Sequence, residues 1–247
     1  MLLAAAVFAL GVGCNVNIDQ GDDDSSSGGD AGPGSDAPIA AEFNSVQKQA
    51  IRGLWAGNLE SERPKDPTNR VANNDRAVKL GHFLFYDKGL SSNGEINCAS
   101  CHPPDHGFAG PKARADQGLG ETDRNAPTLI NVGFQDWYFW GGRTDSVWAQ
   151  AVQPIESPIE MGSSRLEVAH HIYENPKLKE AYEAIDAFDA LPDLSNDNRF
   201  PEEGRPVENP QSKEEESHNQ AWESVSEQDR RKINTGRTDL KKCIAAF

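Results

Sequence analysis

Five consecutive residues, Cys98-Ala99-Ser100-Cys101-His102, constrain the fold of this 247-residue chain more than any other feature. The pattern C-x-x-C-H is the attachment signature of a c-type haem. Its spacing has a chemical reason, because two thiols must reach the vinyl groups on one edge of a porphyrin while the adjacent imidazole rises beneath the iron. We therefore expect one covalently bound haem c, attached through Cys98 and Cys101, with His102 as the proximal iron ligand.

Two other kinds of site use a C-x-x-C pair. A structural zinc ribbon needs a second pair of ligands, and the sequence has none. A thioredoxin-like redox pair lies where a strand leads into a helix, whereas this pair follows the turn-rich segment 90–94 (LSSNG). Haem attachment is therefore the favoured interpretation of the motif.

The N-terminus predicts export from the cell. An apolar run at 2–12 precedes Cys14 and resembles a lipoprotein signal, and it is too short to span a membrane. We expect 1–13 to be the signal peptide and Cys14 to carry the lipid, which would hold the protein on the periplasmic side of a bacterial membrane by this anchor alone. The alternative is an ordinary cleaved signal followed by an incidental cysteine.

The next segment predicts a tether. Residues 14–40 are rich in Asp, Ser, Gly and Pro and offer almost nothing apolar to bury, so we expect a disordered linker before one folded domain at 41–247. Lipid and haem would use three of the four cysteines. The fourth, Cys243, has no motif partner, and we expect it to be a small buried apolar residue outside any disulfide.

The charge balance argues against nucleic acid as a partner. There are 39 acidic and 24 basic residues, for a net charge of -15. Much of the acidity lies in 186–227, where Pro and Asn also accumulate, and this pattern predicts a solvated loop. An acidic surface could steer a basic electron donor, although a charge run is usually only a soluble face.

Apolar spacing predicts helices separated by long loops, with no sustained period-two alternation. The expected helices are 41–59, 74–86, a segment after Ser164, 178–185 and 225–247. The fold class that fits is a mostly α-helical, cytochrome c-like haem domain. Four histidines occur in helical or polar context and are expected at the surface: His82, His170, His171 and His218.

Four further motifs extend the pattern beyond the haem signature. They are LGHFLFYD at 80–87, RNAPTL at 124–129, FWGGR at 139–143 and QPIESPIEMG at 153–162. Together with the haem motif, this succession resembles the N-terminal, peroxidatic half of the bacterial di-haem cytochrome c peroxidases, including the MauG-like branch.

The resemblance implies a mostly helical enzyme with two domains, each of which holds one c-type haem. The N-terminal haem reduces hydrogen peroxide, and the C-terminal haem supplies electrons that come from a cytochrome or a small copper protein. The resemblance also implies roles for residues at matching positions. Cys98, Cys101 and His102 would be the haem ligands, and Gln150 and Glu160 would form the distal pocket. Trp140 would be the tryptophan between the haems, and Asn125 would be a calcium ligand.

The bare sequence also offers simpler interpretations of these residues. Glu160 could be an exposed acid, Gln150 an ordinary polar residue, Trp140 a core residue, and Asn125 a turn residue. The catalytic interpretation of Glu160 makes chemical sense, because heterolysis of peroxide needs a group that moves a proton between the two oxygens.

Switchable members of the family carry a distal histidine on the loop after the haem motif. Residues 112–124 contain none, and His106, four residues past His102, is expected to be a loop residue. The sequence therefore predicts a five-coordinate or water-ligated iron that needs no reductive activation.

No second C-x-x-C-H follows 225–247, a segment that resembles the helix leading into the second haem domain. The chain is thus expected to lack the C-terminal haem domain or to meet it on another chain. Three function classes remain: a peroxidase, a single-haem electron carrier with Met161 as the one plausible sulfur ligand, and a fragment of a MauG-like oxidase. The surviving distal motif favours the peroxidase.

Overall fold

The structure is a computed structural model that describes residues 43–53 and 66–247. The chain divides into two compact units, Met1–Leu59 and Glu60–Phe247. The first contains α1 (Ser45–Gly53), which confirms the middle of the helix predicted at 41–59. The predicted signal peptide 1–13, the lipid site Cys14 and the linker 14–40 lie outside the described residues.

The second unit is built from helices and loops. Within 66–247, strand-like pairing is limited to one isolated bridge between Tyr138 and Thr144. None of the described helices combines the length and apolar character needed to cross a bilayer. The α-helices are α2 (Asp75–Tyr86), α3 (Cys98–Cys101), α4 (Val147–Ala151), α5 (Gln153–Glu156), α6 (Arg165–Glu174), α7 (Pro176–Glu183), α8 (Lys213–Ser224) and α9 (Glu227–Ala246). Short 3-10 turns form η2 (Lys88–Leu90), η3 (Pro104–His106) and η4 (Val132–Phe134). The predicted mostly α-helical class is confirmed.

The longer predicted helices begin where their capping residues dictate. Side chains of Asn74, Ser164 and Ser226 accept backbone N–H groups at the starts of α2, α6 and α9. These caps satisfy donors that the first helical turn leaves unpaired. The helix predicted at 178–185 starts two residues earlier, because Pro176 suits the first helical position.

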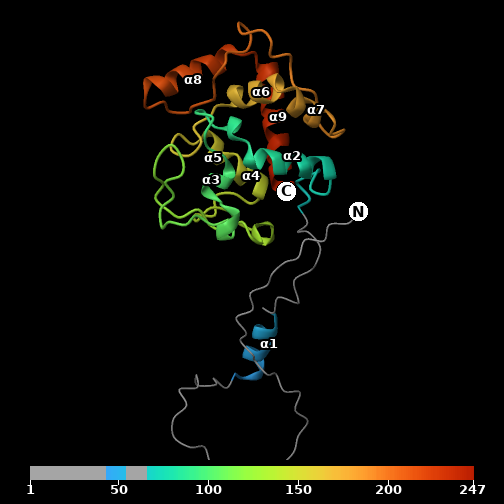
Figure 1. Cartoon of the computed structure of the whole chain (residues 1–247), viewed down its shortest axis with the longest axis vertical. Coiled ribbons are helices and arrows are strands. Elements are labelled where there is room, and N and C mark those ends of the chain that lie inside the picture. Colours follow the sequence, from blue (N-terminus) through green and yellow to red (C-terminus); the bar gives the residue numbers. More distant parts are fainter. Residues whose placement is uncertain (1–42, 54–65) are drawn as a thin grey trace, which may run out of the picture. The chain divides into compact units, whose positions relative to one another are not determined.

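Helix α9 is the centre of the second unit (Figure 1), since it contacts α2, α4 and α6. The contact with α2 is a close approach of two backbones. A Cβ atom added to Gly81 would lie only 1.9 Å from the carbonyl oxygen of Cys243. Cys243 itself is fully buried in the main core, which confirms the prediction for this residue.

Polar side chains reinforce the same contact from the segment before α2. Asp239 of α9 is 2% exposed and accepts hydrogen bonds from Arg70 Nη2 (2.9 Å) and the Tyr182 hydroxyl (3.2 Å). Burial raises the pKa of the Asp239 carboxyl, and Arg70 opposes that effect. The Asn69 amide donates to the Lys242 carbonyl at 2.9 Å. The main core is therefore held by buried hydrogen bonds as well as by apolar packing.

The prediction of a solvated loop throughout 186–227 is wrong, because α8 forms within it. The Ser212 hydroxyl caps this helix by accepting from Glu215 N. The acidic residues of its first turn, part of the charge run in the sequence, are favoured there by the helix dipole. Trp222 then packs into a second core cluster with Leu166 and Phe200, and this burial holds the helix in place.

The expectation of four surface histidines is wrong for two of them. His170 and His218 are buried, and His170 Nε2 lies 3.1 Å from the Pro201 carbonyl. His171 is partly buried, and its Nε2 lies 2.8 Å from Asp87 Oδ2. Burial raises the pKa of Asp87, but the bond to His171 helps to bring that pKa below its usual value. His82 is exposed as predicted, with its ring against that of Phe247. Helical context alone did not reveal which helix faces are covered.

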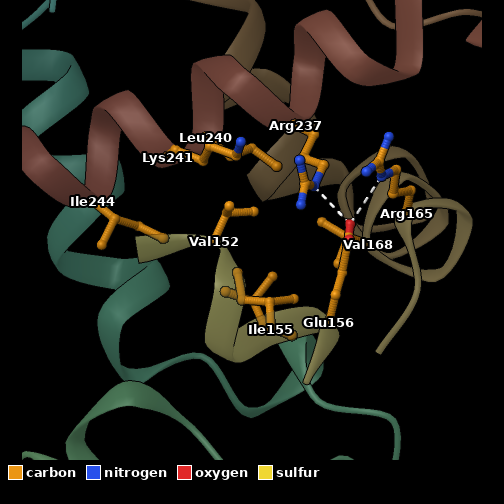
Figure 2. A pocket seen from close by; sticks show the side chains of 10 residues that line it. Val152, Ile155, Glu156, Arg165, Val168, Arg237, Leu240, Lys241 and Ile244 are labelled. Carbon is orange, nitrogen blue, oxygen red and sulfur yellow. Dashed lines mark hydrogen bonds and ion pairs between the residues drawn. The ribbon is translucent and has the colours of Figure 1, made fainter. Parts of the chain in front are cut away.

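An ion cluster joins α5 and α6 to α9 (Figure 2). Glu156 Oε1 accepts from Arg165 Nε at 3.0 Å and Arg237 Nε at 2.7 Å, and Lys241 lines the same pocket. Burial lowers the pKa of Arg237 to about 10 and that of Lys241 to about 8. A single carboxylate therefore compensates two partly buried guanidinium groups and fixes the start of the segment that leads to Glu160.

Replacing Gly81 with alanine is expected to destabilise the protein by roughly 3 kcal/mol, because the new methyl group collides with the α9 backbone. Alanine is worth about 1 kcal/mol more than glycine in a helix, so the clash must outweigh that gain. Urea unfolding measures the difference. Gly141→Ala is the matched control, since no atom lies within 4 Å of its added Cβ. Equal stability of the two variants would contradict the close approach.

Replacing Glu156 with glutamine is expected to cost about 2–3 kcal/mol, because Arg165 and Arg237 lose their charged partner in a partly buried site. Glu227→Gln is the control, since Glu227 and Arg231 form an ion pair in which both side chains are more than 70% exposed (71% and 76%). Thermal unfolding at pH 7 compares the two. A control that is as unstable as the Glu156 variant would show that burial does not determine the effect.

Candidate functional site

The cysteine pair occupies a single helical turn. Asn97 caps α3 by accepting from Ser100 N at 2.9 Å, and Ser100 returns a contact to the Asn97 backbone, so the turn is closed on both sides. Residues three apart on a helix share a face, which places Cys98 and Cys101 side by side. Both are free thiols. The Asn97 amide donates to the Tyr86 carbonyl (2.8 Å) and thereby ties the motif to the end of α2.

His102 follows this turn with its ring held by a backbone oxygen. Nδ1 lies 3.0 Å from the Phe108 carbonyl, and since a carbonyl only accepts, Nδ1 carries the proton. The lone pair of Nε2 is then available to a metal. Burial lowers the pKa of His102, against the opposing effects of the Phe108 and Pro127 carbonyls and of the Glu160 charge. A lowered pKa favours the neutral ring, which is the form that binds a metal.

Backbone hydrogen bonds hold the Glu160 segment against the loop that follows the haem motif. The Glu160 carbonyl accepts from Leu119 N at 3.0 Å, and the Ile159 carbonyl accepts from Gly120 N at 2.9 Å. A Cβ on Gly118 would lie 2.6 Å from the Ile159 oxygen, so this approach requires glycine. Burial raises the pKa of Cys101, and the charge of Glu160 raises it further. The charge of Glu160 thus acts on both Cys101 and His102, which puts this predicted catalytic carboxylate within electrostatic range of the haem motif.

Gln150 is the other predicted distal residue. It lies half-buried in α4, and its backbone is part of that helix. No hydrogen bond joins its side chain to another residue in the part of the chain that the structure describes. Its amide is therefore free to meet a ligand, but no contact in the structure links it to His102.

Trp140 does not pack in the core. Its side chain is 67% exposed and lies in a turn next to Phe139, whose φ of 62° is in the left-handed region. The Arg143 guanidinium covers the Phe139 ring at 3.3 Å from the ring centre. The simpler interpretation, a core tryptophan, is thereby contradicted, and the indole is accessible to a partner.

Asn125 holds the loop that follows the haem motif. Its amide nitrogen donates to the Gly110 carbonyl at 2.7 Å and to the Lys112 carbonyl. The amide oxygen has no hydrogen bond within the described residues and could meet a cation. No cluster of three or more His, Cys, Asp or Glu side chains suited to a metal occurs in 66–247, so a calcium site would need ligands that this part of the chain does not supply.

The residues around the motif fit a haem. Two unpaired thiols and an imidazole that a backbone carbonyl orients through Nδ1 form the donor set of a c-type haem. Three large apolar side chains in the surrounding loops are exposed, namely Leu119, Ile130 and Ile159. A porphyrin face could cover apolar side chains of this kind.

Sequence reasoning missed the carbonyl that orients His102. Phe108 takes a left-handed backbone conformation, with φ 56°, directly after Gly107, with φ 63°. A backbone oxygen leaves no residue signature, and Gly107 was the only available hint. The backbone pairing of Gly118 and Gly120 with 159–160 was equally invisible, although two glycines so close together indicate a close approach of chains.

The fold and the site define a helical haem protein of the cytochrome c type. The family model for di-haem cytochrome c peroxidase matches residues 75–201. This match covers half of the chain, and the chain belongs to the di-haem cytochrome c peroxidase family, a family of haem c oxidoreductases.

Named relatives extend this result. The methylamine utilization protein MauG of Paracoccus denitrificans is 32% identical over 151 residues, covering 53% of this chain and 37% of the relative. A cytochrome c peroxidase of Escherichia coli is 30% identical over 155 residues, covering 60% and 33%. A cytochrome c peroxidase of Denitromonas iodatirespirans is 45% identical over 108 residues, covering 43% and 25%. The chain thus spans between a quarter and two fifths of the length of these relatives.

Proposed function

We propose that this chain binds one haem c through Cys98, Cys101 and His102 and reduces hydrogen peroxide with electrons from a small redox protein. When bound, the haem supplies the redox-active iron at which peroxide is reduced. The proposal is supported by the hydrogen bond that orients the His102 ring through Nδ1 and by the charge of Glu160, which acts on both His102 and Cys101. A family of peroxidases and MauG proteins supports this chemistry.

Glu160 has the role of moving a proton. Its carboxylate accepts the proton of one peroxide oxygen and returns it to the other, which leaves as water. The backbone bonds to Leu119 and Gly120 hold this segment in place, so the side chain reaches the reaction from a fixed position. The free amide of Gln150 would orient the peroxide by donating a hydrogen bond to it. Two electrons and two protons then convert one peroxide to two waters.

Electron entry is assigned to Trp140, whose exposed indole is accessible to a partner. The partner is an electron-donating cytochrome, a small copper protein or a separate second haem domain. With that second domain, the amide oxygen of Asn125 would complete a calcium site. The protein would work on the periplasmic side of a bacterial membrane, held by lipid at Cys14.

An electron carrier with a methionine-ligated iron is less well supported. Met161 is 4% exposed and packs in the main core cluster with Leu80 and Ile155. Its sulfur would have to leave that core to reach an iron, and emptying a packed core position destabilises the fold. The similarity to MauG leaves a second candidate function, which is a MauG-type oxidation of a protein residue.

The ferric absorption spectrum of the haem-loaded chain, recorded before and after addition of hydrogen peroxide, tests the proposal. We expect a high-spin spectrum that changes promptly with peroxide and returns as a reduced donor cytochrome is oxidised. A low-spin spectrum indifferent to peroxide would mean a saturated iron and would overturn the peroxidase assignment.

Replacing Cys98 and Cys101 together with alanine is expected to abolish covalent haem, because no other thiol lies in the motif. Haem staining after denaturing electrophoresis measures the attachment. Cys243→Ala is the control, since this thiol is buried in the core and outside the motif. Retention of haem by the double variant would refute the assignment.

Replacing Glu160 with glutamine is expected to slow peroxide reduction about 10²-fold or more, because the amide cannot relay a proton. Haem content should stay unchanged. Stopped-flow absorption with excess peroxide gives the rate. Glu95→Gln is the matched control, an exposed carboxylate three residues before the motif, and it should react at the wild-type rate. A Glu160 variant as fast as this control would exclude the carboxylate from the reaction.

A further inference from the structure

We propose that Thr128 is a positioning residue for the iron ligand: its hydroxyl fixes the Gly107–Phe108 peptide, which aims the Phe108 carbonyl at His102 Nδ1. The proposal rests on iron ligation by His102, as part of the proposed function, and is independent of the peroxide chemistry. It concerns how strongly the imidazole binds iron.

The peptide between Gly107 and Phe108 is held at both ends. Thr128 Oγ1 donates to the Gly107 carbonyl at 2.6 Å. Phe108 N donates to the Pro103 carbonyl at 3.0 Å. With its oxygen and its nitrogen both bonded, this peptide plane cannot rotate, and it sets the direction in which the chain enters Phe108.

Phe108 needs this support because its backbone is strained. Its φ of 56° lies in the left-handed region, which a residue with a Cβ adopts only at a cost. The contribution of one hydrogen bond is similar in size to that cost, so loss of the Thr128 bond removes enough stabilisation for the loop to relax. The neighbouring residue, Gly107, pays no such cost at its φ of 63°.

Thr128 is itself oriented by its surroundings. Its hydroxyl oxygen accepts from Ile130 N at 3.1 Å, so the proton of the hydroxyl is left to point at Gly107. Next to it, Gly110 N donates to the Ala126 carbonyl at 2.8 Å, and the amide of Asn125 donates to the Gly110 carbonyl. Residues 125–128 therefore lie along 107–110 and fix the shape of the loop that faces His102.

The geometry has an electronic consequence for the ligand. Donation from Nδ1 to a carbonyl pushes electron density toward Nε2 and strengthens its bond to a metal. A Phe108 carbonyl that drifts away weakens this effect. The iron–histidine bond should then become weaker, and the ferrous iron should become easier to form.

Three variants of the full haem-loaded chain test the proposal. Thr128→Val removes the hydroxyl and nearly keeps the shape, and because Thr128 is exposed the substitution creates neither a cavity nor a clash. Thr128→Ser restores the hydroxyl. Thr122→Val is the matched control, since the Thr122 hydroxyl donates to the Arg124 carbonyl at 2.7 Å in the same loop without touching Gly107 or Phe108.

Resonance Raman spectra of the reduced proteins report the iron–histidine stretching band, and redox titration reports the midpoint potential, which needs no open sixth position. We expect the band to move to lower wavenumber and the potential to rise in Thr128→Val alone. Thr128→Ser and Thr122→Val should both match the wild type.

Each outcome is decisive. A Thr128→Val protein with the wild-type band and potential overturns the proposal. If Thr128→Val fails to mature with haem, a Thr128→Ser protein with a shifted band and potential does the same, because the hydroxyl would then not be the determinant. If His102→Gly leaves the wild-type spectrum unchanged, the ligation by His102 has failed instead, which separates this inference from the proposed function on which it rests.

Discussion

The close approach of α2 and α9 at Gly81 and Cys243 is the contact on which the rest of the second unit depends. No side chain separates the two backbones there, so the helices are fixed relative to each other by main-chain atoms. Helix α2 delivers the haem motif, because its last carbonyl, that of Tyr86, is bonded by Asn97. Helix α9 supports α4 and, through the Glu156 cluster, the segment that continues to Glu160. Both halves of the candidate site therefore rest on one pair of helices.

The helices that could be predicted from sequence are those with a cap and an apolar stripe. Asn74, Ser164 and Ser226 precede such stripes, and the helices begin there. Helix α8 could not be predicted in the same way, because its apolar face consists of little more than Trp222 in an acidic stretch. It exists because that face meets Leu166 and Phe200, which lie far away in the sequence. Burial in the folded protein, rather than local composition, determines that this segment is helical.

In the candidate site too, some parts could be predicted from the sequence and others are determined only by the folded chain. Cys98, Cys101 and His102 are close in sequence, so their spacing alone predicts the donor set. Glu160 lies about sixty residues away, and only the resemblance placed it at the site. The parts supplied by backbone atoms, such as the Phe108 carbonyl and the pairing of Gly118 with 159–160, could not be predicted, because any residue offers a carbonyl and only the folded chain determines where it points.

The pairing of α2 with α9 also sets the order of events during synthesis. The bond from Asn69 to Lys242 joins groups 173 residues apart, so the main core includes contacts that form only after most of the chain is made. A chain that emerges from the ribosome N-terminus first must present α2 and the cysteine pair long before α9 arrives. The thiols of this protein therefore pass through a period in which they are accessible in a chain whose main core is not yet assembled.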